Sequence, residues 1–389
     1  MVQVSKTFRI FISSTFNDLI NERNALQKKV FPIIKSLCIK HGCRFQAIDL
    51  RWGVREEAAL DQRTIKICIE EIERCRDITP RPNFMIILGD RYGWRPLPYE
   101  IPAEEFEAIK NNLSSDDNER EVQKTLLERW YWLDKNAKDM IYILQPRRDE
   151  FINSENWKKV EEELYKIISD AIKKSDLNED TVVKYLSSAT EQEIIHGALA
   201  KPDNLPHVFC FFRRFDDTLS PDMGDFVDLD EFGKIDIDPY QKLKKLKKKL
   251  RSQMPHQICN YKAKWQLGRI SEKHINKFCK DVKKALGKII KKEIKLIKQT
   301  KQIDLEIQNH QEFAKDRRKF FRGRQEYLNQ IEDYIMSNIS QPLVLFGESG
   351  SGKTALIAKS SSRINKKYAD VHLISRFIGA TPRLSLIHV

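Results

Sequence analysis

The chain has 389 residues, of which 41% are hydrophobic, 10% aromatic and 32% charged, enough for two or three soluble, helix-rich domains. It shows neither a run of about 18 apolar residues nor a signal-peptide layout, so we expect a cytoplasmic location and no membrane partner. Seven cysteines, an odd number without a C-x-x-C pair, argue against a disulfide framework or a zinc site.

The formal net charge is +13, and the positive charge is unevenly distributed along the chain. It is concentrated in residues 243–251, 283–301 and 315–324. In the first two segments apolar residues recur at helical spacing, so the lysines would occupy the polar faces of amphipathic helices. We favour solvated or domain-contacting helix faces, and binding to nucleic acid or to acidic partners is the alternative that this charge leaves open.

Three short apolar runs near the start of the chain are typical of strands in a buried parallel sheet. They are residues 7–13, 44–50 and 83–89. Helical patterns at residues 18–41 and 61–76 separate them. This alternation predicts βαβ units, and therefore an α/β domain with a flavodoxin-like parallel sheet.

Hydroxyl, charged and aromatic residues follow directly after each of these runs. In open α/β sheets, ligands bind outside the carboxyl ends of the strands. These residues therefore predict a pocket at that edge, although the tryptophans could instead simply pack loops over the end of the sheet. The predicted pocket residues are Ser13, Asp49, Arg51, Trp52, Asp90, Arg91 and Trp94.

The pattern changes near residue 97, and we expect residues 97–186 to be an insertion that is rich in helices. The helix start SSATEQEI (187–194) and the strand-like run 207–215 would then complete the first sheet. The first domain is accordingly expected to span residues 1–230. A basic helical connector is expected over residues 231–317.

The sequence LFGESGSGKTAL contains G-x-x-x-x-G-K-[ST], the spacing of a P-loop. An apolar run at residues 342–346 precedes it and predicts a strand, and a helical pattern follows. The glycines would let backbone N–H groups surround the phosphates of ATP or ADP, Lys353 would reach the β- and γ-phosphates, and Thr354 would ligate Mg²⁺. The motif residues are Gly347, Gly350, Gly352, Lys353 and Thr354.

A P-loop NTPase also needs an acidic residue on a later strand to hold the magnesium ion. One further strand-like run, residues 371–378, follows the P-loop before the sequence ends at Val389. We therefore expect residues 318–389 to form an incomplete NTPase domain, which would bind nucleotide without appreciable hydrolysis by this chain.

Four segments in order, FRIFISSTFNDLINERNAL, AIDLRWGVREEA, CIEEIERC and ILGDRYGW, resemble the N-terminal domain of the telomerase-associated vault protein, of nephrocystin-type proteins and of many bacterial NACHT proteins. The similarity resumes at SSATEQEI and reaches the P-loop. It implies a TIR-like first domain followed by the start of a NACHT or STAND ATPase module. The segment FRGRQEYL resembles the stretch that helps to seat adenine in this family, which adds Arg322, Gly323 and Arg324 to the nucleotide site.

The resemblance implies a signalling or defence protein in which bound nucleotide sets the assembly state. The intact NTPase module would then self-associate in response to an unknown protein trigger. As an alternative, the TIR-like domain would cleave NAD, because active TIR domains carry a catalytic glutamate at the matching helix start. Glu193 is the first candidate and Glu191 the second. Both glutamates also fit S/T-x-x-E capping boxes and could serve only the end of the helix. A non-enzymatic docking scaffold is therefore the third hypothesis.

Overall fold

A computed structural model describes residues 7–50, 60–79, 81–137, 139–200, 202–299, 302–337, 339–348, 350–368 and 371–380. These residues divide between two units, one within residues 5–294 and the other within residues 295–389. Among the described helices, none is both long and apolar enough to span a membrane.

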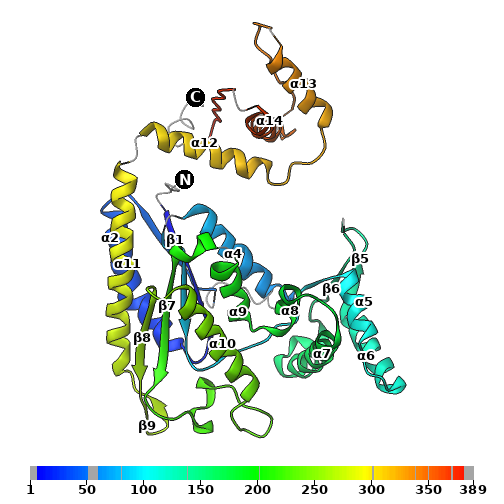
Figure 1. The fold of residues 1–389 in the computed structure, drawn as a ribbon, viewed down its shortest axis with the longest axis vertical. Helices are drawn as coiled ribbons and strands as arrows, with labels where there is room; N and C mark the ends of the chain where they lie inside the picture. Colours follow the sequence, from blue (N-terminus) through cyan, green and yellow to red (C-terminus); the bar gives the residue numbers. More distant parts are fainter. Residues whose placement is uncertain are drawn as a thin grey trace. The chain divides into compact units, whose positions relative to one another are not determined.

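The first unit is built on a five-stranded parallel sheet with the strand order β2-β1-β3-β7-β8 (Figure 1). Every pairing in this sheet is parallel, and the three apolar runs expected to be strands are β1, β2 and β3. The predicted α/β class with a parallel central sheet is therefore confirmed. The strands are β1 (Thr7–Ser14), β2 (Arg44–Ile48), β3 (Phe84–Leu88), β7 (Val208–Phe215) and β8 (Ile258–Ala263).

The fourth strand, β7, pairs with β3 from Phe84↔Val208 to Leu88↔Phe212, as expected for residues 207–215. The fifth strand, β8, lies in the segment for which we expected a helical connector. Its sequence, ICNYKA, has polar residues among its apolar ones and is surrounded by lysine-rich segments, so the pattern does not indicate a strand. Because β8 pairs with β7, the first unit extends well beyond the boundary expected at residue 230.

Helices cover both faces of this sheet (Figure 1). On one face, Phe84, Ile86 and Leu88 of β3 pack with side chains from α4, α9, η4 and α10. On the other, Phe211 of β7 meets Phe278 of α11 edge to face at 5.6 Å. The helices of this layered part are α1 (Ile20–Ala25), η1 (Leu26–Val30), α2 (Phe31–Ile39), α4 (Thr64–Ile78), α9 (Ala189–Ile194), η4 (Ile195–Leu199), η5 (Pro202–His207), η6 (Pro221–Phe226), α10 (Ile237–Gln253) and α11 (Lys273–Gln299), and a short hairpin is formed by β9 (Trp265–Gln266) and β10 (Arg269–Ile270).

The segment between β3 and α9 has a sheet and a core of its own. Its three strands form an antiparallel sheet in the order β4-β6-β5. Its buried apolar cluster runs along the sequence from Leu97 to Tyr185, so this part packs as a separate layer within the first unit. The elements are β4 (Glu100–Pro102), α5 (Ala103–Asn111), α6 (Asp117–Trp130), β5 (Tyr131–Asp134), β6 (Ile141–Leu144), η3 (Asp149–Ile152), α7 (Ser154–Lys174) and α8 (Glu179–Leu186).

The described part of the second unit contains the end of α11 from Lys295 and the helices α12 (Gln302–Arg318), α13 (Gln325–Met336) and α14 (Lys353–Lys367), with extended segments between and after them. The strands expected at residues 342–346 and 371–378 are absent from the described residues, which is a correction. An extended run becomes a strand only through a hydrogen-bonded neighbour, and none of the described residues pairs with these two runs. Val344 and Phe346 accordingly remain 72% and 90% exposed.

Candidate functional site

Helix α9 brings Glu193 to the carboxyl end of β1. Ser188 caps this helix, because its Oγ accepts a hydrogen bond from the Glu191 backbone N at 3.3 Å. Glu193 lies farther along the helix, where it is buried, and its Oε2 accepts a hydrogen bond from Ser13 Oγ at 2.6 Å. The contact joins residues 180 positions apart, so it depends on the whole fold rather than on the local chain.

Burial raises the pKa of Glu193 to about 7. The hydrogen bond from Ser13, the positive charge of Arg23 and a hydrogen bond from Cys68 all oppose this rise, and the charge of Asp49 supports it. Burial also raises the pKa of the Cys68 thiol, which therefore stays protonated and able to donate. A carboxyl group that titrates near neutral pH can take up and release a proton under physiological conditions.

Glu193 lines a cavity of about 190 Å³ at this edge of the sheet. Its walls come from the loop after β1, the first turns of α4, the loop after β3 and the start of α9. They combine hydroxyl groups, one arginine, one thiol and two aromatic rings. The lining residues are Ser14, Thr15, Phe16, Asn17, Thr64, Ile65, Cys68, Arg91, Gly93, Trp94, Ala189, Thr190 and Glu193.

Two of the predicted pocket residues, Arg91 and Trp94, line this cavity, as does the catalytic candidate Glu193. Ser13 does not line the cavity, but it donates a hydrogen bond to Glu193, which does. Trp94 is about half exposed, and its indole Nε1 donates to Glu161 Oε1 at 3.0 Å. Arg51 and Trp52, which we also expected here, lie outside the described residues.

Asp49 forms a buried ion pair with Arg23 rather than lining the cavity. The Arg23 Nη2 and Nε atoms donate to the two Asp49 carboxylate oxygens at 2.6 and 3.1 Å. Arg23 Nη1 also donates to Ser14 Oγ at 2.7 Å. This bidentate pair ties β1, β2 and α1 together.

Asp90 and Arg91 follow β3, and each contacts a residue of the opposite charge. Asp90 Oδ1 accepts from Lys247 Nζ of α10 at 3.3 Å. Arg91 forms an ion pair with Asp228 at 3.5 Å and donates to the Asp225 carbonyl at 3.1 Å. Arg91 therefore lines the cavity while its guanidinium group is already held by the loop around residue 228.

Glu191, the second catalytic candidate, is engaged by Tyr92. The Tyr92 hydroxyl donates to Glu191 Oε2 and accepts from the Ser188 backbone N at 3.1 Å. Burial is the largest cause that raises the Tyr92 pKa, and the Glu191 charge adds to it. Glu191 is therefore part of the connection between α9 and the loop after β3, and it is not among the residues that line the cavity.

A second buried charge network is centred on Arg213 of β7. Arg213 of β7 pairs with Asp18 at 2.9 Å and with Glu22 at 3.1 Å, and all three side chains are almost completely buried. Glu22 also accepts from His274 Nε2 at 3.0 Å. Burial raises the pKa of Asp18 to about 6, against the charge of Arg213. For Glu22 burial acts in the same direction, but the His274 hydrogen bond and the Arg213 charge together lower its pKa.

Sequence reasoning missed Glu22 and Arg23, although a signal was present. Leu19 and Leu26 define the apolar face of the first helix, and positions 22 and 23 fall on that same face. Charged residues at apolar-face positions are rarely buried unless they are paired. The positions of Glu22 and Arg23 on the apolar face could therefore have predicted a buried ion network from the sequence alone.

The second candidate site is the P-loop segment in the second unit. Gly350 and Gly352 have positive φ angles of 80° and 83°, a region that favours glycine, and α14 begins directly afterwards at Lys353. Lys353 Nζ donates to the carbonyl oxygens of Gly347 and Glu348, each at 2.7 Å. The lysine thus folds over its own loop, and Thr354 at the start of the helix is exposed.

The segment containing Arg322, Gly323 and Arg324 approaches this loop. Gly323 and Arg324 have positive φ angles of 69° and 55°, and α13 begins at the next residue. The Arg324 guanidinium group lies beside Gly352, where an added Cβ would stand 3.4 Å from Nη1. The chain therefore places a second cation next to Lys353 at the start of α14.

Comparison with known proteins gives one family model and several relatives. Residues 9–184 match a domain of unknown function, DUF4062. No solved structure matches this chain. The relatives include the NACHT domain- and WD repeat-containing protein 1 of Mus musculus, which is 27% identical over 94% of this chain. The NACHT and WD repeat domain-containing protein 2 of Homo sapiens is 28% identical over 98% of this chain.

A shorter match carries higher identity. Telomerase protein component 1 of Rattus norvegicus is 38% identical over 97 residues, which is 25% of this chain and 4% of that protein. The homologues of this chain thus include NACHT- and WD repeat-containing proteins and a telomerase protein component, in agreement with the resemblance seen in the sequence. The chain spans about a quarter of the length of the two NACHT-containing relatives, 24% of each.

Proposed function

We propose that this chain forms an effector or interaction domain and the nucleotide-binding loop of a NACHT-type signalling protein, in which bound ATP or ADP acts as a switch. The homology to NACHT-containing proteins over most of the chain supports the class. Nucleotide would act at the loop 347–354, and the parallel-sheet domain would transmit the signal to a protein partner or to further copies.

The observation that carries this proposal is the arrangement at the start of α14. A helix N-terminus preceded by glycines with positive φ offers backbone N–H groups to phosphate oxygens. Lys353 Nζ donates to two loop carbonyls, and phosphate oxygens would replace these acceptors when nucleotide binds. Arg324 would add positive charge, and the exposed Thr354 would supply a hydroxyl to Mg²⁺.

Isothermal titration calorimetry with Mg·ATP and Mg·ADP on the full chain tests nucleotide binding. We expect saturable binding that Lys353→Ala weakens by about tenfold or more, because a charge-assisted hydrogen bond to phosphate is lost. Lys366→Ala removes the same charge from an exposed position in the last turn of α14 and should leave the affinity unchanged. Equal affinities for wild type and Lys353→Ala would overturn the proposal.

A second candidate function, NAD cleavage, is favoured by the buried Glu193 carboxyl in its cavity. In this reaction water adds to C1′ of the nicotinamide ribose while the glycosidic bond breaks, giving nicotinamide, ADP-ribose and a proton. Ionised Glu193 would stabilise the positive charge that develops on the ribose. Trp94 would offer a ring face to the nicotinamide or adenine.

Incubation of the full chain with NAD and chromatography of the products tests this candidate. We expect nicotinamide from wild type and none from Glu193→Gln. Glu191→Gln should retain activity, because the Glu191 carboxylate binds Tyr92 outside the cavity. Equal amounts of nicotinamide from wild type and Glu193→Gln, or none from either, would contradict catalysis by Glu193. The non-enzymatic docking function would then be the one that remains.

A further inference from the structure

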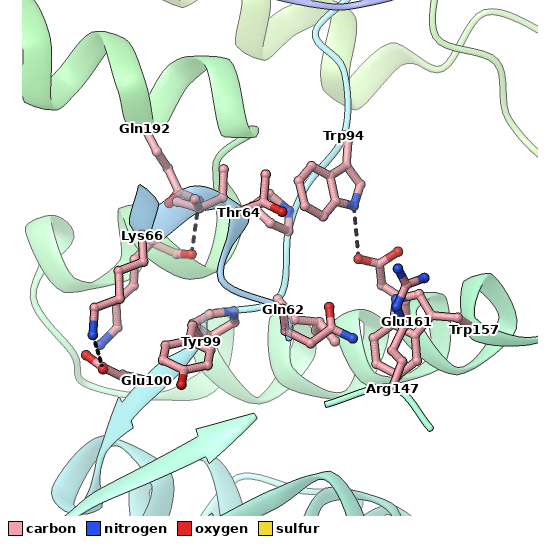
Figure 2. Close-up of a pocket in the computed structure, with 15 residues that line it drawn as sticks. Gln62, Thr64, Lys66, Trp94, Tyr99, Glu100, Arg147, Trp157, Glu161 and Gln192 are labelled. Atoms are coloured by element: carbon pink, nitrogen blue, oxygen red, sulfur yellow. Dashed lines mark hydrogen bonds and ion pairs between the residues drawn. The ribbon is translucent and has the colours of Figure 1, made fainter. Parts of the chain in front are cut away.

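A larger cavity, of about 340 Å³, lies where the parallel-sheet part of the first unit meets the inserted layer (Figure 2). Its walls come from the first turn of α4, the segment 94–100, α7 and the residues around Arg147. It shares Thr64, Ile65 and Trp94 with the Glu193 cavity but otherwise has its own lining. A volume of this size is at the lower end of the range for small-molecule sites.

Aromatic rings supply the apolar surface of this cavity. Figure 2 shows Trp94 on one side, with Tyr99 and Trp157 across from it. Trp157 is buried in the core of the inserted layer and Trp94 is about half exposed, so one ring is fixed and the other is accessible. Lys66 Nζ lies 5.4 Å from the Tyr99 ring centre, and the Arg147 guanidinium carbon 5.9 Å from that of Trp157. Such rings provide flat faces for a planar ligand.

Two buried hydrogen-bond donors at this cavity have no acceptor among the described residues. They are Gln62 Nε2 and Arg147 Nε. A buried donor without a partner costs about 1–3 kcal/mol, so an acceptor supplied by a ligand would be favourable. Gln62 also has a φ angle of 60°, which is uncommon for a residue other than glycine. Backbone strain of this kind is often found at binding sites.

The charges at the cavity favour an anion beside Arg147. Lys66 pairs with Glu100 at 2.5 Å and Lys184 with Glu105 at 2.6 Å, so both lysines have counter-ions. Arg147 forms no ion pair with any residue that the structure describes. The nearby Glu161 accepts a hydrogen bond from Trp94, and its charge supports the Arg147 cation against the lowering of the Arg147 pKa by burial, but the two form no ion pair. Of the three cations that line this cavity, Arg147 is therefore the one without an ion pair among the described residues, and its guanidinium group can still bind an anionic ligand.

We propose that this cavity binds a nucleoside monophosphate, a ligand that combines a planar ring with an anionic group. The base would lie against Trp94, Tyr99 and Trp157. The phosphate would accept hydrogen bonds from Arg147 Nε and Gln62 Nε2, since arginine binds phosphate with fixed geometry. The site does not include the P-loop residues or Glu193, although it shares Trp94 with the Glu193 cavity, so it adds a small-molecule input to the signalling function proposed above.

Calorimetric titration of the full chain with AMP, adenosine and ribose 5-phosphate tests this proposal. All proteins carry Lys353→Ala, so that the P-loop contributes little to the signal. We expect AMP to bind at least about tenfold more tightly than either of its parts, because only AMP uses both the rings and the donors. Equal affinity for AMP and ribose 5-phosphate, or no saturable heat with AMP, would overturn the proposal.

Variants at adjacent arginines supply a matched control. Arg147→Gln should weaken AMP binding by about tenfold or more, because a charged donor is lost. Arg148→Gln, at the exposed neighbouring position, should bind as before. Gln62→Leu should weaken binding independently if Arg147→Gln fails to fold. Unchanged AMP affinity in the folded variants would place the ligand elsewhere, and a loss caused only by Glu193→Gln would move it to the smaller cavity.

Discussion

The carboxyl group of Glu193 makes the stability of the first unit depend on pH. Burial raises its pKa from 4.5 to about 7, so the folded state holds the proton more tightly than the unfolded state does. The stability linked to this proton is fully present below about pH 4.5 and is lost as the pH rises to about 7. Glu193→Gln, which stays neutral, should therefore gain stability relative to wild type with rising pH, by roughly 3 kcal/mol at most.

Urea unfolding of both proteins at about pH 5 and about pH 8 measures this difference. Glu70→Gln, at an exposed position of α4, is the control and should follow the pH curve of wild type. Parallel curves for wild type and Glu193→Gln would show that Glu193 is already ionised in the folded protein.

Arg213 is the cation on which two buried carboxylates depend. Its side chain is fully buried between Asp18 and Glu22, and removing it would leave both negative charges without this partner. Arg213→Met should lower the free energy of unfolding by about 3–5 kcal/mol. Arg214→Met, at the next and exposed position of β7, should change it by less than about 0.5 kcal/mol. Similar midpoints for the two variants in urea unfolding would contradict this assignment.

At the level of elements, Tyr92 connects the loop after β3 to the start of α9. Its hydroxyl bonds both Glu191 and the Ser188 backbone N, and α9 in turn positions Glu193. Tyr92→Phe should destabilise the protein by about 1–3 kcal/mol, because both partners lose a hydrogen bond in a buried place. In a double-mutant cycle with Glu191→Gln, we expect a coupling energy of at least about 0.5 kcal/mol. Additive effects would show that the contact contributes nothing to α9.

The strands that could be predicted from the sequence are those whose apolar runs are buried on both faces. Phe84–Leu88 is buried at every position, and a buried parallel strand has this pattern. The fifth strand escaped prediction because Asn260 and Lys262 are exposed and interrupt its run. The run at residues 342–346 was predicted to be a strand and is not one. It has the composition of a strand, but no described residue forms the ladder of hydrogen bonds that a strand needs.

The candidate site could be predicted to a similar extent. Arg91 and Trp94 could be predicted to lie at one cavity because they follow a strand of the sheet, and Glu193 could be predicted because it lies near the start of a helix. The partners of Asp49 and Asp90 could not be foreseen, because Arg23 and Lys247 come from helices whose docking only the folded structure defines. The cavity beside Arg147 was also missed, since it forms between the sheet and a layer whose orientation the sequence does not specify.

For the whole molecule, the division into two units predicts two unfolding transitions. The first unit has an extensive core around a five-stranded sheet, whereas the second is formed by helices with exposed extended segments. Differential scanning calorimetry of the full chain should therefore resolve a less stable transition for residues 295–389 and a more stable one for residues 5–294.

Ligand linkage then assigns each transition. Mg·ADP at about a hundredfold above its dissociation constant stabilises the unit that binds it by about 2.7 kcal/mol, and it should raise the lower transition alone. Lys353→Ala should abolish this shift, while Glu193→Gln at about pH 8 should move only the upper transition. If Mg·ADP raised both transitions together, or if a single transition were observed, the two units would be coupled in folding. The nucleotide signal would then already reach the parallel-sheet domain within these 389 residues.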